Sequence, residues 1–413
     1  MTPEELTAAR ERLEEFAAEM FAPLSRSDQR VKGQTYLRGL LLDGRRKSMQ
    51  PMAERLGVDH QGLQQFVSSS TWAVEPIRER LARRAVAVIA PDAWVVDDTG
   101  FVKDGAASPG VARQYCGTLG KVGNCQIGVS ISAVTDAASC PLNWRLFLPQ
   151  GWDDAAAATP EAAAAIAARR ARAGIPAEVR HHPKWRLALE MLDELAGWGL
   201  RPPVVAADAG YGNNGDFRAG ITARGSHYVA AVDGDLTAHA QGVVPTLKPY
   251  SGRGRRPRPR YRTRPMGLRE HALAAGHHAA RQVTWREGSR GPMTSRFLAL
   301  RVRPAGRKPT ARLGADGSLP DAWLLAEWPP EATEPTDYWL SDLPEDTPLP
   351  ELVRLAKIRW RIEHDYRECK TGLGLDHFEG RTFTGWHRHV TLVTAAQLFL
   401  TVLRSSPKAA TPA

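Results

Sequence analysis

The sequence predicts an α/β protein whose core is interrupted by a mostly β insertion. Strand-like and helix-like segments alternate over residues 91–233. Segments in which apolar and polar residues alternate, as is typical of antiparallel strands, follow in residues 234–349. Helical patterns occupy residues 1–90 and return over 350–405. We therefore expect a core built from two stretches that lie far apart in the chain, preceded by a helical region.

The N-terminal region, residues 1–90, is expected to be a helical DNA-binding region. The stretch SMQPMAERLGVDHQGLQQFV resembles a helix-turn-helix with Gly57 at the turn. The residues expected to form its small core are Ala53, Val58, Leu63 and Phe66. A pair of helices joined in this way can place the second helix in a major groove. Any helical hairpin gives a similar pattern, and Gly62 inside the second helix weakens the match.

Residues 91–233 supply the first part of the predicted core. Three predicted strands come first, namely AWVVDDTG, NCQIGVSISAV and PLNWRLFLP, with a glycine-rich hairpin connection before the second. A polar alanine-rich helix and the amphipathic helix PKWRLALEMLDELAGWGL follow. The strand in RPPVVAADAGYG, a further helix start and the strand SHYVAAVDG complete the segment. This order of strands and helices is that of a ribonuclease-H-like sheet.

Residues 234–349 depart from that order. The run PYSGRGRRPRPRYRTRP is charged and broken by prolines, so we expect either a disordered linker or a salt-dependent clamp on phosphates. The predicted antiparallel strands are RQVTWREG, SRFLALRVRP, DAWLLAEWPP and DYWLSDLP. Their tryptophans, Trp285, Trp323, Trp328 and Trp339, are expected in the core, with stacking on an unpaired base as the alternative. From residue 350 the chain is helical again, and residues 406–413 are predicted to be a disordered tail.

The composition favours a polyanionic partner. The formal net charge is +10, which indicates nucleic acid more than membrane, although a genome that enriches arginine would account for part of it. The four cysteines show no metal-type spacing and are expected to be free thiols in a reducing cytosol. The sequence shows no signal-peptide pattern and no apolar run long enough for a membrane span. A cytoplasmic protein is therefore expected.

Acidic residues follow two of the predicted core strands. Asp97 and Asp98 end one strand and Asp208 ends another, where functional residues of α/β sheets collect. Each acid also has a structural explanation, because an acid that leaves a strand often caps a turn or helix. Strand alternation places Asp97 and Asp98 on opposite faces, so only one of them is expected in a shared site.

The segment RWRIEHDYRECKTG supplies a third acid. On a single helix, Arg359, Glu363 and Lys370 fall within about 40° of one another. One helix face would then present a guanidinium, a carboxylate and an ammonium group. Glu368 lies about 140° from Glu363 and is expected to face solvent or pair locally. A solvated charged face is the alternative for the whole segment.

The three blocks VVDDTG, VVAADAGYG and RWRIEHDYRECKTGLG resemble those of DDE transposases from bacterial insertion sequences. More narrowly, they resemble the group with the Y-R-E-K signature and its relative, insertion-sequence family 701. The resemblance extends from about Ser25 to Leu403. One departure is visible, because the signature's tyrosine falls on Ala356, and Tyr366 would have to supply that hydroxyl from another turn.

This resemblance implies a ribonuclease-H-like core with a β insertion and a catalytic triad of Asp98, Asp208 and Glu363. Asp98 is preferred to Asp97 because the family's aspartate precedes a small residue of the threonine type, as Asp98 precedes Thr99. The triad would hold two Mg²⁺ ions, with Mn²⁺ as a substitute, because hard cations prefer oxygen ligands. The expected activity is cut-and-paste DNA transposition, by phosphodiester hydrolysis and 3′-OH strand transfer.

Double-stranded DNA, as transposon ends and target, is the expected partner, and a homodimer is expected in the DNA complex. Arg359 and Lys370 are expected to hold phosphates near the metals. The other expected DNA contacts are Arg45, Arg46, Lys47, Arg113 and Lys121, with Asn124 a weaker candidate. Two other functions stay open. The chain could be a domesticated or inactive relative that acts as a DNA-binding regulator, or a cellular structure-specific nuclease of the same fold.

Overall fold

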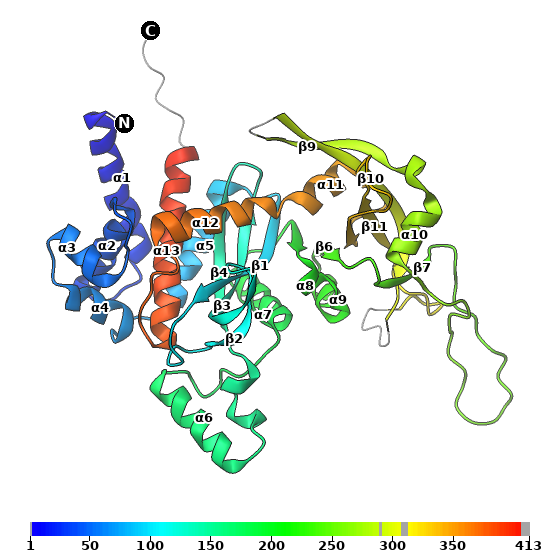
Figure 1. Ribbon diagram of the computed structural model, residues 1–413, viewed down its shortest axis with the longest axis horizontal. Helices are drawn as coiled ribbons and strands as arrows, with labels where there is room; N and C mark the ends of the chain where they lie inside the picture. The colour runs from blue at the N-terminus through cyan, green and yellow to red at the C-terminus, as the bar shows by residue number, and fades with distance from the viewer. Residues whose placement is uncertain (1, 289–290, 307–312, 406–413) are drawn as a thin grey trace, which may run out of the picture. The chain divides into compact units, whose positions relative to one another are not determined.

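The computed structural model of this 413-residue chain describes residues 2–288, 291–306 and 313–405 (Figure 1). The chain forms two compact units. The first comprises the residues up to Pro91, Asp97–Leu200 and the residues from Arg361 on, and the second comprises Asp92–Val96 and Arg201–Trp360. These borders differ from the borders of the segments predicted from the sequence. The division of the chain into those segments remains a prediction. The predicted tail at 406–413 lies outside the described residues.

Five helices open the first unit. Their bounds are Pro3–Phe21 (α1), Ser27–Leu41 (α2), Met49–Leu56 (α3), His60–Ser68 (α4) and Glu75–Ile89 (α5). Helix α1 begins with a capping box, in which the Thr2 side chain accepts from the backbone N–H of Glu5 and the Glu5 carboxylate accepts from that of Thr2. Such reciprocal bonds satisfy amide groups that have no partner within the helix.

Helices α3 and α4 are joined by a tight turn at Gly57, whose φ of 67° is the left-handed conformation that glycine adopts without strain. Ala53, Leu63 and Phe66 are buried, as predicted. Val58 is exposed, so its predicted place in the small core is wrong. The reason is that Val58 follows the left-handed residue directly, and its backbone N–H closes the turn on the carbonyl of Ala53. A helical hairpin is therefore present, and its binding to DNA remains a prediction.

The strands of the first unit are the end of β1 (Ala93–Val102), β2 (Ala112–Cys116), β3 (Lys121–Val134) and β4 (Ser139–Phe147). Strand β3 pairs with β1 and lies antiparallel to β2 and β4. The short helices η1 (Gln150–Trp152) and η2 (Asp154–Ala156) lead to α6 (Pro160–Arg172) and α7 (Lys184–Gly197). The predicted apolar face of α7 is buried through Leu187, Leu189, Leu192 and Leu195.

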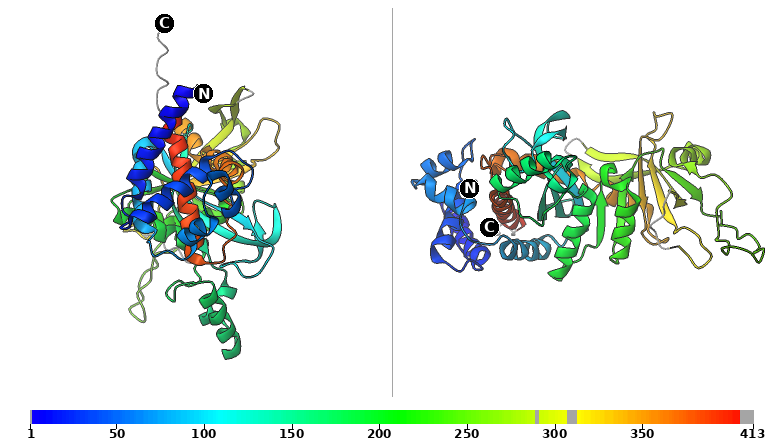
Figure 2. Two further views of the ribbon diagram at one scale, coloured as in Figure 1. Left: turned by 90° about the vertical axis from the view of Figure 1, so that its left-hand side faces the viewer. Right: turned by 90° about the horizontal axis from the view of Figure 1, so that it is seen from below.

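Helices α12 (Trp360–Leu373) and α13 (Phe383–Ser405) complete the first unit. Helix α13 is buried along most of its length and packs beside α2, α5 and β4 (Figures 1 and 2). None of the helices among the described residues is long and apolar enough to cross a membrane. All four cysteines are buried free thiols.

The second unit contains the remaining core strands, β5 (Val204–Ala207) and β6 (His227–Val232), with the helices α8 (Ala209–Gly212) and α9 (Gly215–Ala223) between them. The start of β1 pairs in parallel with β5, with Val96 opposite Ala207, and β5 pairs in parallel with β6. Four strands, then helices, a strand, helices and a strand follow one another along the chain, one strand more than predicted, because the short β2 pairs with β3. This mixed α/β arrangement agrees with a ribonuclease-H-like core.

The rest of the second unit is mostly β structure. Its strands are β7 (Thr237–Ala240), β8 (Met266–Gly267), β9 (Arg281–Gly288), β10 (Gly291–Pro304), β11 (Ala322–Glu327) and β12 (Asp337–Ser341). Its helices are α10 (Leu268–Ala275), η3 (His277–Ala279) and α11 (Leu349–Lys357). Strands β9 to β12 pair antiparallel in sequence, as their alternating patterns predicted, and β12 pairs antiparallel with β6. Trp328 and Trp339 are buried, whereas Trp285 and Trp323 are half-buried.

Candidate active site

The first pair of acids lies on β1. Asp98 forms an ion pair with Lys184 at the start of α7, with 2.9 Å between Oδ2 and Nζ. Asp97 is buried, and its Oδ1 accepts from the backbone N–H of Asp98 at 2.8 Å. The Asp98 side chain keeps 22% of its surface exposed. The Asp98 side chain is thus more open than that of the buried Asp97, and the two carboxylates alternate along the strand.

The second acid, Asp208, follows β5 directly. Val96, which precedes the two acids of β1, lies opposite Ala207, which precedes Asp208, in the parallel pair of β1 and β5. Strand β1 continues to Val102 and also pairs with β3, so the prediction that Asp97 and Asp98 end their strand is wrong. Asp208 is the N-cap of α8 and accepts from the backbone N–H of Tyr211 at 3.3 Å. Its Oδ2 lies 3.8 Å from Nη2 of Arg359.

The glycine at position 212 explains why the chain after Asp208 can turn so tightly. A Cβ on Gly212 would lie 1.9 Å from the carbonyl oxygen of Ala231 in β6, which no real side chain could occupy. The short helix α8 therefore packs against β6 only with glycine there. This close approach holds Asp208 at the end of its strand.

The third acid, Glu363, lies exposed in the first turn of α12. The single helix predicted for this segment is wrong in one respect, because α11 ends at Lys357 and α12 begins at Trp360. Arg359 lies in the turn between them and does not share a helix face with Glu363. Its guanidinium instead pairs with Asp208 within the second unit.

Lys370 occupies the last turn of α12, as predicted, but its ammonium has partners within the protein. It donates to the carbonyl of Gly100 at 2.8 Å and to Oγ1 of Thr118 at 2.7 Å. Burial lowers its pKa. The residue therefore ties α12 to β1 and to the turn that leads into β3. A contact between Lys370 and phosphate remains a prediction.

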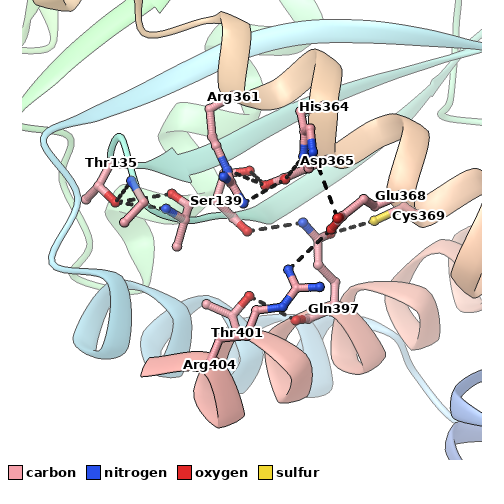
Figure 3. Close-up of polar contacts among 12 residues, drawn as sticks. Thr135, Ser139, Arg361, His364, Asp365, Glu368, Cys369, Gln397, Thr401 and Arg404 are labelled. Atoms are coloured by element: carbon pink, nitrogen blue, oxygen red, sulfur yellow. Dashed lines mark hydrogen bonds and ion pairs between the residues drawn. The ribbon is translucent and has the colours of Figure 1, made fainter. Parts of the chain in front are cut away.

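A polar network holds the opposite side of α12 (Figure 3). The buried carboxylate of Asp365 pairs with Arg361 at 3.0 Å and accepts from the hydroxyl of Ser139 in β4. Gln397 of α13 donates to the carbonyl of Ser139 at 3.1 Å and accepts from the thiol of Cys369 at 3.0 Å. These bonds anchor α12 through Asp365 and Cys369, whereas Glu363, about 200° from Asp365 around the helix, is exposed.

This network also contains the candidate metal cluster that the described residues offer, His364, Asp365 and Glu368, whose ligand atoms lie within 4.8 Å of one another. Arginines already neutralise its carboxylates, because Arg361 pairs with Asp365 and Arg404 pairs with Glu368 at 3.2 Å. The cluster is explained as an anchor of α12. Glu368 is exposed, which agrees with the expectation that it faces solvent, and its partner Arg404 comes from α13.

The three basic residues before α3 differ in exposure. Arg45 and Arg46 are exposed, and Arg46 pairs with Glu379 at 3.2 Å. Lys47 is buried, and its ammonium donates to the carbonyl of Leu42. Burial lowers its pKa. Lys47 therefore points into the protein, and its contact with a phosphate remains a prediction.

Arg113 and Lys121 are exposed. They lie in the paired strands of the β2–β3 hairpin, whereas the sequence suggested a loop between strands. Asn124 lies opposite Arg113, and its amide donates to the carbonyls of Lys103 at 2.6 Å and Gly105 at 3.1 Å. That side chain therefore has a structural role. Sequence reasoning missed Lys184, which no local pattern distinguishes from other surface lysines.

Comparison with known families agrees with this arrangement. Residues 19–292 match the family described as DDE superfamily endonuclease. That stretch is more than half of the chain, which therefore belongs to the DDE superfamily of endonucleases. Asp98 and Asp208 lie within the matched residues, and Glu363 lies beyond them.

The chain is also similar to a protein of Microchaete diplosiphon described as a probable transposase for insertion sequence element IS701. The two are 26% identical over 198 residues, which is 47% of this chain and 46% of the relative. The match thus spans about half the length of that curated relative.

Proposed function

We propose that this protein is a DNA transposase that binds the terminal repeats of an insertion sequence, cleaves both strands and joins the freed 3′ ends to a target. Membership of the DDE endonuclease family supports cleavage of DNA. The observation that carries the proposal is that acids follow directly after Val96 and Ala207, which lie opposite each other in the parallel strands β1 and β5. A third acid, Glu363, stands exposed on a helix whose other side is anchored.

We propose Asp98, Asp208 and Glu363 as the residues that hold two divalent cations. Their donor set fits Mg²⁺, because all three offer carboxylate oxygens and no histidine or cysteine is needed. Asp98 pairs with Lys184 and Asp208 pairs with Arg359, and this positive charge beside both carboxylates supports the proposal. When bound, such ions activate an oxygen nucleophile and stabilise the departing 3′ oxygen. Mn²⁺ would replace Mg²⁺.

The protein's own residues would bind and orient the DNA. Arg359, Lys370, Arg45, Arg46, Arg113 and Lys121 are the proposed phosphate contacts. Arg359 is the strongest of them, because its guanidinium lies beside a proposed metal ligand. Joining two ends of one element requires at least a dimer in the DNA complex.

The test is cleavage of duplexes that carry the sequences flanking the coding region, with and without Mg²⁺. Glu363→Ala is expected to abolish cleavage. Glu368→Ala is the matched control, because Glu368 is an exposed carboxylate of the same helix that pairs with Arg404. Equal cleavage by wild type and Glu363→Ala would refute the assignment and favour a DNA-binding regulator. Loss of cleavage in both variants would show that α12 had been damaged and not that Glu363 is catalytic.

A further inference from the structure

A long basic excursion leaves the second unit between β7 and β8. We call residues 246–262 the basic loop. Eight cationic side chains stand in and beside it with no acidic residue among them, namely Lys248, Arg253, Arg255, Arg256, Arg258, Arg260, Arg262 and Arg264. All eight are exposed. Within the described part of the chain, none of them pairs with a carboxylate.

The basic loop is closed at its base and is not an open linker. Thr246 and Arg260 exchange two backbone hydrogen bonds, of 2.9 and 3.1 Å, in an isolated antiparallel bridge. The guanidinium of Arg262 donates to Oγ1 of Thr246 at 3.1 Å. The ends of the loop are therefore held together, which removes much of the conformational freedom that binding would otherwise have to restrict.

The base is also fastened to the sheet of the second unit. Tyr261 stacks on His239 of β7, with ring centroids 4.1 Å apart, and its hydroxyl accepts from the backbone N–H of Leu319 at 2.9 Å. On the other side, Arg303 of β10 donates to the carbonyl of Val243 at 3.1 Å. Arg303 itself pairs with Asp321. Arg303, which fastens the base of the loop, thus has an acidic partner, whereas the cations of the loop have none among the described residues.

The loop's cations converge on one hollow. Its volume is about 580 Å³, and its lining includes Lys248, Arg255, Arg256, Arg258, Arg260 and Arg262. Pro257 and Pro259 alternate with these arginines and restrict the backbone, so that the charges stay spread along an extended stretch. Like charges held together without counter-charges are favourable only when an anion neutralises them.

We propose that the basic loop binds the sugar–phosphate backbone of double-stranded DNA without reading its sequence. Guanidinium groups pair with phosphate through two parallel hydrogen bonds, and a row of them matches the repeated charge of a duplex. The proposal extends the proposed function, because a transposase must hold DNA, but it concerns binding and not cleavage.

The test measures binding of the full chain to a random-sequence duplex by fluorescence anisotropy, in EDTA, over a series of salt concentrations. Each phosphate contact that is lost lowers the slope of log affinity against log salt by about 0.9. Arg255→Gln/Arg256→Gln/Arg258→Gln should therefore bind more weakly, with a slope smaller by up to about 2.7. Replacing the same three residues by lysine keeps the charge and should keep most of the slope.

A control with the same loss of charge is Arg172→Gln/Arg201→Gln/Arg281→Gln, whose arginines are exposed and lie outside the basic loop. It should leave the slope within about 0.5 of wild type, which is well below the loss of one contact. An unchanged slope in the loop variant, or an equal fall in the control, overturns the proposal. The proposal is also overturned if the basic loop binds anionic lipid vesicles while the salt slope for the duplex is the same in wild type and in the loop variant.

The outcomes separate this proposal from the proposed function. Reduced duplex binding by the loop variant together with no cleavage by the wild type supports the loop and refutes the transposase. Normal cleavage with unchanged binding in the loop variant refutes the loop alone.

Discussion

The ammonium of Lys184 lies 2.9 Å from Oδ2 of Asp98, and this pair joins the start of α7 to the middle of β1. The two residues are far apart in sequence, and both side chains remain partly exposed. A cation therefore already faces the carboxylate that we propose as the first metal ligand. A metal ion that binds Asp98 must compete with this ammonium group.

Lys184→Gln should lower the Mg²⁺ concentration that gives half-maximal cleavage. The expected factor is about two to five, because a partly exposed ion pair contributes up to about 1 kcal/mol. A Mg²⁺ titration of the cleavage rate measures it. Arg186→Gln serves as the control, since Arg186 lies on the same helix and pairs with Glu190. A higher Mg²⁺ requirement in Lys184→Gln would show that the lysine positions Asp98 and does not compete with the ion.

Replacing the two acids of β1 separately should identify the metal ligand. Asp98→Asn is expected to slow cleavage by a factor of at least about 100, because metal ions supply several kcal/mol of transition-state stabilisation. Asp97→Asn keeps an oxygen that can accept from the backbone N–H of residue 98, and its rate should stay within about tenfold of wild type. Single-turnover cleavage measures both rates. The opposite order of effects would move the site to Asp97.

Lys370→Met should destabilise the fold. The substitution removes hydrogen bonds to Gly100 and Thr118, and we expect a loss of about 1–3 kcal/mol in the free energy of unfolding. Urea denaturation measures this loss. Lys121→Met changes an exposed lysine of the β2–β3 hairpin, whose turn contains Thr118, and should have little effect on this free energy. If Lys370→Met kept full stability and lost only DNA affinity, Lys370 would be a phosphate contact and not a structural tie.

The buried His389 should make the fold sensitive to acid. Its Nδ1 accepts from the hydroxyl of Tyr36 at 2.9 Å, and its Nε2 donates to the carbonyl of Gly374 at 3.0 Å, so the neutral ring is satisfied. Burial lowers its pKa to about 4. The unfolded chain takes up this proton near pH 6.5, whereas the folded chain does so only near pH 4.

The stability from His389 is therefore present above pH 6.5 and is lost as the pH falls towards 4, by about 1.4 kcal/mol per pH unit. Urea denaturation of wild type and His389→Gln at several pH values between 7 and about 4 measures it. The variant is expected to be less stable at neutral pH and to lose less on acidification. An equal pH dependence in both proteins would contradict the assignment.

Much of the core was predictable because its signals are local. The apolar runs around Val95, Val205 and Val229 predict strands, and the spacing of Leu187 to Leu195 predicts the buried face of α7. The alternation in β9 to β12 predicts antiparallel pairing. Each of these patterns repeats with the period of its own helix or strand, because one face of that element is buried. A single segment is long enough to show this repeat.

The errors lie where a side chain's partner comes from elsewhere in the chain. The break between α11 and α12 moves Arg359 off the helix of Glu363, and nothing in RWRIEHDY marks it, since no proline or glycine stands there. The charge of Lys47 favours a phosphate contact, yet the side chain is buried and donates to the carbonyl of Leu42. The positions of residues around a helix and their charges follow from the segment alone. They do not show which other segments pack against it.

The order of residues along the chain decided which stretches become strands and helices. It also decided that acids stand on β1, directly after β5 and on α12. Folding decided which of these charges meet a partner. Lys184 pairs with Asp98, and Arg359 pairs with Asp208. Asp365 accepts a hydrogen bond from Ser139, whereas Glu363 on the same helix is exposed. The physical reason is that backbone periodicity is a short-range property, whereas electrostatic pairing and burial depend on groups that become neighbours only in the packed molecule.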